Sequence, residues 1–197
     1  MDNMFTEPLP TRIRILRAAR QCFAKNGFHS ASMKTICGAC GMSPGTLYHH
    51  FPSKDALIEA IILEDQERAL THFRDPLEGV GLVDYLVDSM IEVTQEDYAQ
   101  RALVVEIMAE GMRNPLVAEM LKNKYQTITG SLVTRFTEAQ KSGEIGADID
   151  KGIAARMLLA ITYGILSDSE AAENARHAAF ADTFRNMVNG LLSVPKI

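Results

Sequence analysis

The sequence predicts an all-α protein, because its apolar residues recur at helical spacing and the alternation typical of strands is missing. Along most of the 197 residues, apolar side chains follow the i, i+3, i+4 pattern that places them on one face of a helix. There is no sustained alternation of β-branched or aromatic residues with polar ones. Glycine and proline separate the periodic segments, and these segments predict about nine helices.

Four helices are expected in the first third of the chain. Ser32 and Ser53 are suitable N-caps for the second and fourth helices, and Gly27 and Gly41 are expected to end the first and second. Pro44 falls in the first turn of the third helix, where proline is tolerated. The expected ranges are 10–26, 32–40, 44–50 and 53–73. Two short helices joined by a tight glycine turn predict a helix-turn-helix.

A break at Asp75-Pro76 and Gly79-Val80-Gly81 separates this region from longer helices. The later helices are expected at about 82–93, 103–112, 117–143, 150–166 and 172–192. We therefore expect an N-terminal three-helix helix-turn-helix domain at 9–70, with its exposed third helix at about 43–50. A C-terminal helical domain is expected at 76–197.

The charge of the chain is strongly divided along its length. The net charge is −5, but residues 1–54 hold seven Lys and Arg against only Asp2 and Glu7, while the remainder is acidic. A basic N-terminal domain on an acidic body suits contact with a polyanion through that domain alone. The alternative is a chance cluster of solvated arginines on the first helix.

Residues 41–54, GMSPGTLYHHFPSK, resemble the signature of the TetR/AcrR family of regulators. The similarity extends upstream through Gly27-Phe28 and Ile36, and downstream to Leu57. The resemblance implies a dimeric transcriptional regulator that binds double-stranded DNA through its N-terminal domain. It also implies that the C-terminal domain binds a small molecule and forms the homodimer.

The third helix can also be interpreted physically. Leu47 and Phe51, four residues apart, are expected to point inward and leave Thr46, Tyr48 and His49 outward. In an isolated helix, Tyr48 and the histidines would more often be partly buried, and the surrounding signature favours DNA contact instead. By resemblance, the DNA-binding residues are Lys34, Ser43, Pro44, Gly45, Thr46, Tyr48, His49 and Lys54.

The resemblance implies a ligand pocket among the helices of residues 82–142 and part of the next helix. Flexible methionine and amphipathic tyrosine make adaptable apolar walls. The candidate ligand-binding residues are Tyr85, Met108, Met112, Tyr125, Phe136 and Tyr163. Ordinary core packing is the alternative for each. Glu106 and Glu110 are expected to form a solvated helix face.

The last two expected helices are rich in small and apolar residues, which suits a dimer bundle. These residues are Ile153, Met157, Ala160, Ile161 and Gly164 on one helix, and Ala179, Phe184, Met187, Val188 and Leu191 on the other. The alternative is a monomeric bundle that buries the same faces internally. A two-fold pair of recognition helices would bind a near-palindromic operator.

Two short patterns suggest other chemistry. Cys37 and Cys40 form a Cys-x-x-Cys spacing, but they match core positions and no second Cys/His pair lies at zinc-finger spacing. Residues 41–45 satisfy the GxSxG pattern of a serine hydrolase with Ser43 as nucleophile, but that motif requires a preceding strand and a parallel sheet. We therefore expect no enzyme activity, metal or cofactor.

Neither a signal peptide nor a membrane-spanning apolar run is evident, so the expected location is the cytoplasm without membrane association. Combined with the resemblance, these observations predict a repressor that a small-molecule ligand releases from its operator. The alternatives are an activator or a regulator of the same fold that has no effector.

Overall fold

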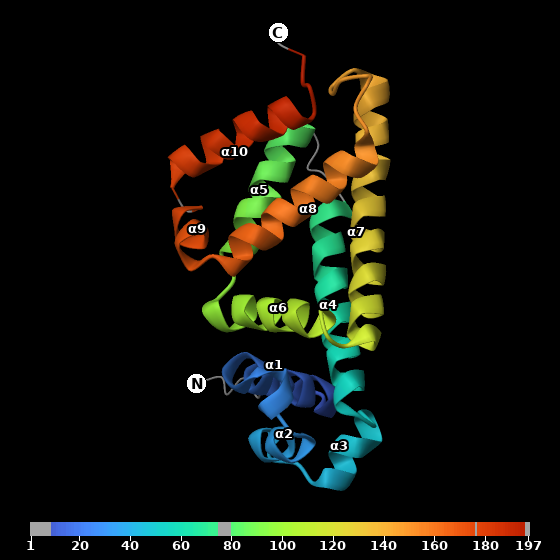
Figure 1. The fold of residues 1–197 in the computed structure, drawn as a ribbon, viewed down its shortest axis with the longest axis vertical. Coiled ribbons are helices and arrows are strands. Elements are labelled where there is room, and N and C mark those ends of the chain that lie inside the picture. The colour runs from blue at the N-terminus through green and yellow to red at the C-terminus, as the bar shows by residue number, and fades with distance from the viewer. Residues whose placement is uncertain (1–8, 75–79, 176, 196–197) are drawn as a thin grey trace, which may run out of the picture.

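The computed structural model describes residues 9–74, 80–175 and 177–195, and these ranges contain helices and no strands. Figure 1 shows α1, α2 and α3 together at one end of an elongated molecule, with the remaining helices forming the other end. The helices are α1 (Thr11–Ser30), α2 (Met33–Cys40), α3 (Pro44–His50), α4 (Lys54–Arg74), α5 (Leu82–Thr94), α6 (Tyr98–Gly111), α7 (Pro115–Ser142), α8 (Lys151–Ser167), α9 (Ser169–Asn174) and α10 (Ala178–Leu191). The predicted all-α class is confirmed.

The helix ends follow the local signals in the sequence. The Ser32 hydroxyl accepts the Thr35 N–H and begins α2, which ends at Gly41 in the left-handed conformation (φ 65°). Gly27 has φ 74° and ψ 161°, but it kinks α1 instead of ending it, and helical structure resumes to Ser30.

Two predicted boundaries in the C-terminal domain are wrong. The helix expected at 103–112 begins earlier, at Tyr98, because the Asp97 carboxylate accepts the Gln100 N–H and caps the helix. The single helix expected at 172–192 is divided into α9 and α10. Asp168 caps the first of these two helices, and His177 lies at the N-cap of the second. Most of the predicted break, residues 75–79, lies outside the described residues.

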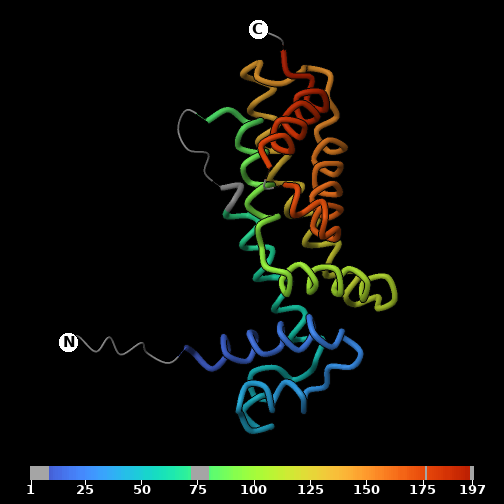
Figure 2. Tube along the Cα trace, turned by 90° about the vertical axis from the view of Figure 1, so that its left-hand side faces the viewer, coloured from blue at the N-terminus to red at the C-terminus, as the bar shows by residue number. Residues whose placement is uncertain are grey.

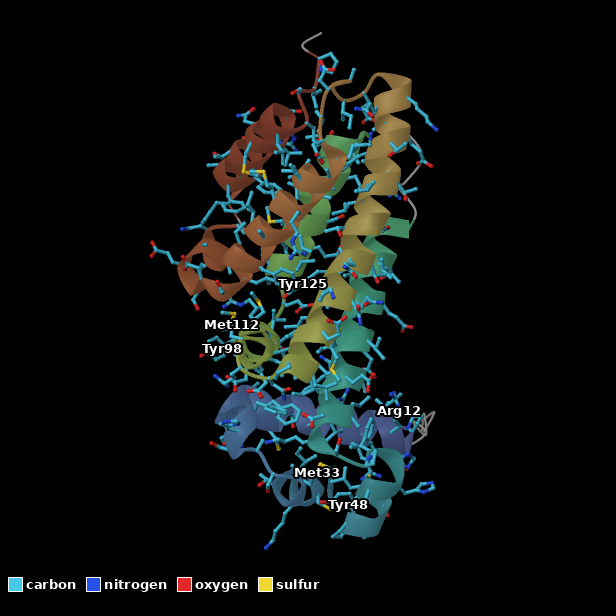
Figure 3. The ribbon with its side chains drawn as sticks, turned by 45° about the vertical axis from the view of Figure 1, so that its right-hand side comes forward. Arg12, Met33, Tyr48, Tyr98, Met112 and Tyr125 are labelled. Carbon is cyan, nitrogen blue, oxygen red and sulfur yellow. The ribbon has the colours of Figure 1, made fainter. Side chains whose placement is uncertain are left out.

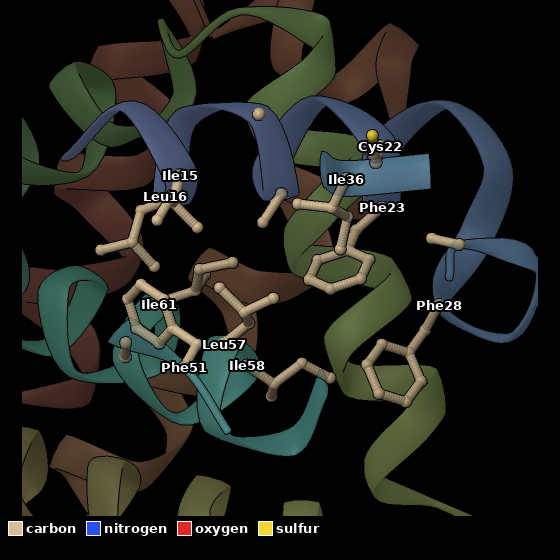
Figure 4. Packing of buried hydrophobic residues seen from close by; sticks show 14 of the residues in the cluster. Ile15, Leu16, Cys22, Phe23, Phe28, Ile36, Phe51, Leu57, Ile58 and Ile61 are labelled. Atoms are coloured by element: carbon tan, nitrogen blue, oxygen red, sulfur yellow. The ribbon is translucent and has the colours of Figure 1, made fainter. Parts of the chain in front are cut away.

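The hydrophobic core of the N-terminal domain continues beyond the predicted boundary at residue 70. Figure 4 shows side chains of α1, α2 and α4 meeting in this core, among them Phe23, Ile36 and Leu57. The same cluster also contains Leu103 and Ile107 of α6 and Val117 and Leu121 of α7. Helix α1 is therefore packed directly against α6, and α4 against α7.

A second core lies at the opposite end of the molecule. It is built from α5, α7, α8 and α10, with Leu132, Phe136 and Val188 among its most buried residues. Figures 1 and 2 show α4 rising from the N-terminal domain alongside α7, while α6 crosses between the two ends. Helix α7 contributes to both cores, and α4 and α6 pack against it, so these three helices connect the parts of the molecule. Among the described helices, none is both long and apolar enough to cross a membrane.

Candidate nucleic-acid interface and ligand cavity

Helix α3 presents its polar face at the tip of the N-terminal domain. Leu47 is fully buried and Phe51 is 3% exposed, so the expected inward face is confirmed. Tyr48 is 52% exposed, His49 is exposed and Thr46 is half-buried. Figure 3 shows Tyr48 at the end of the molecule remote from the C-terminal domain. The outward side chains are therefore free to enter a groove.

The start of α3 is fixed by its own side chains. The Ser43 Oγ accepts the Thr46 N–H at 3.2 Å and lies 2.9 Å from the Thr46 hydroxyl, and Pro44 occupies the first turn. A Cβ added at Gly45 would meet only the Ser43 hydroxyl, at 3.9 Å, which leaves the backbone open to close approach. Ser43 follows a helix and a turn, not the strand that a hydrolase elbow requires.

The remaining predicted contacts flank α3. Lys34 is exposed on the first turn of α2. Lys54, at the start of α4, is half-buried; its ammonium donates to the Phe28 carbonyl at 2.7 Å and lies 4.2 Å from the centre of the Phe28 ring. A phosphate would therefore have to share the three donors of Lys54 with this contact.

The cysteines are buried inside the N-terminal domain. The Cys37 thiol donates to the Met42 carbonyl, and the Cys40 thiol to the Cys37 carbonyl. Both are free thiols, as is the buried Cys22, whose pKa is raised by burial. Within the described ranges, no cluster of three or more His, Cys, Asp or Glu side chains could hold a metal ion. The thiols therefore fill core space as small apolar groups.

The C-terminal domain contains a cavity of about 110 Å³ against α4. Most of its wall is apolar and comes from α5, α7, α8 and α10, including Leu86, Met90, Ile128, Leu158 and Phe184. The side facing the N-terminal domain is lined by charged and polar groups, which are Asp65, Arg68, Glu96, Gln100, Lys124 and Tyr163. The cavity thus has an apolar part and a polar part.

The polar part is an ionic cluster in which Asp65 and Lys124 are buried while Arg68 is half exposed. Asp65 is 7% exposed and pairs with Arg20 of α1 at 3.0 Å and with Arg68. Arg68 also pairs with Glu96 at 3.3 Å, and burial raises the pKa of Glu96. Lys124 is 6% exposed, and burial lowers its pKa. Buried charges of both signs therefore meet at one end of the cavity.

Of the predicted pocket residues, Tyr163 lines this cavity. Its ring centre lies 5.3 Å from that of Tyr125, which is adjacent to the cavity but not part of its wall. Phe136 is fully buried in the second core, and the Tyr85 ring packs beneath Arg135. Met108 is half-buried on α6 and does not line the cavity either.

Met112, another predicted pocket residue, does not line the cavity. This side chain is 89% exposed at the end of α6, because Gly111 and not Met112 is the last helical residue. Figure 3 shows Met112 on the outer side of α6, near Tyr98.

The solvated face expected for Glu106 and Glu110 is also wrong, since α6 packs against α1. Glu106 accepts the Phe28 N–H at 2.6 Å. Glu110 is 3% exposed and pairs with Arg113 at 2.9 Å. Neither carboxylate lines the cavity: Glu106 links α6 to α1, whereas Glu110 forms a local pair with Arg113.

Sequence interpretation missed the charged residues of the cavity, although spacing contained a signal for two of them. Lys124 occupies the buried stripe of α7 between Leu121 and Ile128, where an apolar residue is expected. Asp65 follows Ile58 and Ile61 on the buried face of α4 in the same manner. A charged residue in an apolar stripe indicates a buried ionic site.

An exposed third helix on a compact three-helix domain, joined to a helical domain with a partly open cavity, defines a DNA-binding transcriptional regulator. The model of the bacterial regulatory proteins of the tetR family matches residues 15–61, and that of the C-terminal domain of BetI-type transcriptional repressors matches residues 82–193. The chain belongs to the TetR family of regulators.

Known proteins similar to this chain agree with that assignment. The HTH-type transcriptional regulator UidR of Escherichia coli K12 is 61% identical over 193 residues, which is 98% of each chain. The solved structure of Salmonella enterica GusR is 79% identical and superposes with a TM-score of 0.91, covering 97% of this chain and 100% of its own. FadR of Bacillus subtilis, solved with stearoyl-CoA, shares the fold alone, at 17% identity and a TM-score of 0.75 over 91% of this chain and 98% of its own.

Proposed function

We propose that the protein is a dimeric repressor whose affinity for a near-palindromic operator falls when a small molecule occupies the cavity. The observation that carries this proposal is that Asp65 and Arg68, on the helix that begins directly after the recognition helix, line the cavity. A ligand there would contact the helix whose tilt sets the position of α3. A ligand with different affinities for two tilts shifts their populations, and DNA lowers ligand affinity by the same factor.

We assign DNA contact to the surface around α3. Thr46, Tyr48 and His49 would enter the major groove, with Thr46 and His49 able to reach base edges. Lys34 and Lys54 lie on either side and would bind phosphates. The backbone of Ser43, Pro44 and Gly45, which starts the helix, would approach the duplex closely.

We infer that the effector combines an apolar part with a polar part that accepts hydrogen bonds. The apolar wall would contact the former. Among the described residues, the Lys124 ammonium has no hydrogen-bond partner; its closest aromatic neighbour is the Tyr163 ring, 5.8 Å from Nζ. A buried cation without a hydrogen-bonded acceptor is costly, and an acceptor on the ligand would compensate it.

We infer a homodimer formed by α8 and α10. Ile153 and Met157 are 59% and 48% exposed on α8, and Met187 is 37% exposed on α10. Ala160 and Gly164 continue the exposed face of α8 with small residues that allow close approach of a partner helix. Phe184 and Val188 are buried internally, so the predicted dimer residues divide between a core and an outer face.

The proposal is tested by selecting bound fragments from genomic DNA and measuring the affinity of the selected fragment by fluorescence anisotropy. We expect tight, sequence-dependent binding by wild-type protein, at least about 10³-fold tighter than to random DNA. Compounds are then screened for release of the labelled fragment. Sequence-independent binding would refute DNA recognition, whereas specific binding that no compound weakens would favour a regulator without an effector.

A further inference from the structure

Helix α6 lies between α1 and the helices of the C-terminal domain, as Figure 1 shows. Gln100 and Val104 of α6 line the cavity. Leu103 and Ile107, on another face of the same helix, belong to the core of the N-terminal domain. A change in the cavity therefore has to cross only one helix to reach α1.

An ionic link crosses the same boundary. Oδ1 of Asp65 accepts from Nη1 of Arg20 at 3.0 Å and from Nη2 of Arg68, and it lies at the cavity wall. The other nitrogen of the Arg20 fork, Nη2, donates to Glu64 at 2.9 Å. One carboxylate oxygen of Asp65 thus accepts hydrogen bonds from two guanidinium groups, that of Arg20 on α1 and that of Arg68 at the cavity wall.

Arg68, on the cavity side of this link, has two further partners besides Asp65, namely Gln100 and Glu96. With its oxygen turned toward the guanidinium groups, the Gln100 amide accepts from Arg68 at 2.7 Å and from Arg20 at 3.3 Å. Arg68 also contacts Glu96, so it keeps a carboxylate partner if it leaves Asp65. Arg68 contacts both carboxylates in this structure, and coupling through the cluster requires a second arrangement in which Arg68 leaves Asp65 for Glu96 or a ligand.

We propose that Asp65 couples the cavity to the N-terminal domain through Arg20. The inference rests on the proposed function and identifies the contacts that transmit it. When Arg68 or Gln100 moves to a bound ligand, Arg20 becomes the main partner of a buried carboxylate, which tightens the pair and draws α1 toward α4. Because linkage is reciprocal, DNA that holds α1 in one position must also change the cavity.

Reciprocity allows a test without the natural ligand. The chain contains no tryptophan, so Tyr163→Trp would place a single indole in the cavity, beside Lys124. The probe is the DNA fragment selected from the genome, with its binding followed separately by anisotropy of a label on the DNA. We expect saturating fragment to change the indole emission, and random DNA to change it much less.

The decisive comparison adds Arg20→Gln to the Tyr163→Trp protein. We expect the fragment still to bind, while the change in emission falls at least about fivefold, the lower end of ordinary allosteric coupling. Lys122→Gln is the matched control, because it removes one positive charge from an exposed pair with Glu119 on α7; the emission change should persist. If Arg20→Gln does not fold, Asp65→Asn removes the shared charge with little change in volume.

The outcomes are distinct. An emission change of equal size with and without the Arg20 link would overturn the proposal, and so would an absence of any change in the protein that keeps Arg20. Failure of the Tyr163→Trp and wild-type proteins to bind any fragment would instead refute the proposed function.

Discussion

Replacing Gly27 with alanine tests the join between α1 and α6. Gly27 has φ 74° and ψ 161°, a conformation that residues with a side chain rarely adopt, and a Cβ there would lie 3.2 Å from Oε1 of Glu106. Holding alanine in this backbone conformation would cost about 1–3 kcal/mol of folding stability. If Glu106 moves aside, it also loses its charge-assisted bond to the Phe28 N–H, which adds ~1–2 kcal/mol for a carboxylate that is partly exposed.

The total of about 2–5 kcal/mol corresponds to a melting temperature lowered by roughly 5–15 °C for a chain of this size. The assay is urea and thermal unfolding followed by circular dichroism at fixed protomer concentration. Gly38→Ala is the control, because Gly38 lies inside α2 with nothing within 4 Å of an added Cβ. That variant should be more stable by about 0.5–1 kcal/mol. Equal shifts of the same sign in the two variants would refute the reasoning.

Three other substitutions give separate tests. Lys54→Ala should lower the slope of the logarithm of the DNA-binding constant against log salt by about one for the selected DNA, whereas Lys122→Ala should leave this slope unchanged. Equal slopes in wild type and Lys54→Ala would exclude a phosphate contact. Burial lowers the pKa of Lys124 in the folded protein, so between that lowered pKa and the ordinary value of 10.5 the unfolded chain binds more protons than the folded one and stability rises with pH. Lys124→Met should remove this rise in urea unfolding and stabilise the protein at neutral pH. A rise that persists in this variant would contradict the assignment. Met157→Asp should convert the dimer into monomers in sedimentation experiments, while Met112→Asp should not; a dimer in both would exclude α8 from the interface.

The recognition helix could be predicted in detail because its signals are local. Ser43 caps the helix, Pro44 begins it, and Leu47 and Phe51 define its buried face, all within nine residues. Such signals depend on backbone geometry over one or two turns and need no knowledge of the tertiary structure.

The cavity could not be predicted in the same way, because it depends on which helices face one another. The aromatic and methionine residues chosen from sequence were suited to a pocket wall, but Phe136 fills a core and Met112 faces solvent. Side-chain chemistry alone does not distinguish these surroundings. The charged residues Asp65 and Lys124 were the better indicators, since a charge in a buried stripe requires a compensating partner.

The boundary predicted between the domains divides the sequence but not the hydrophobic core. Leu103, Ile107, Val117 and Leu121 complete the core around Phe28, so the N-terminal domain is held by residues that follow it by many positions in the chain. A core of this kind resists continuous deformation and shifts between discrete packings. Because α6 belongs to that core and also lines the cavity, the proposed ligand and DNA would act through the same packed helix, which is the physical basis of the proposed coupling.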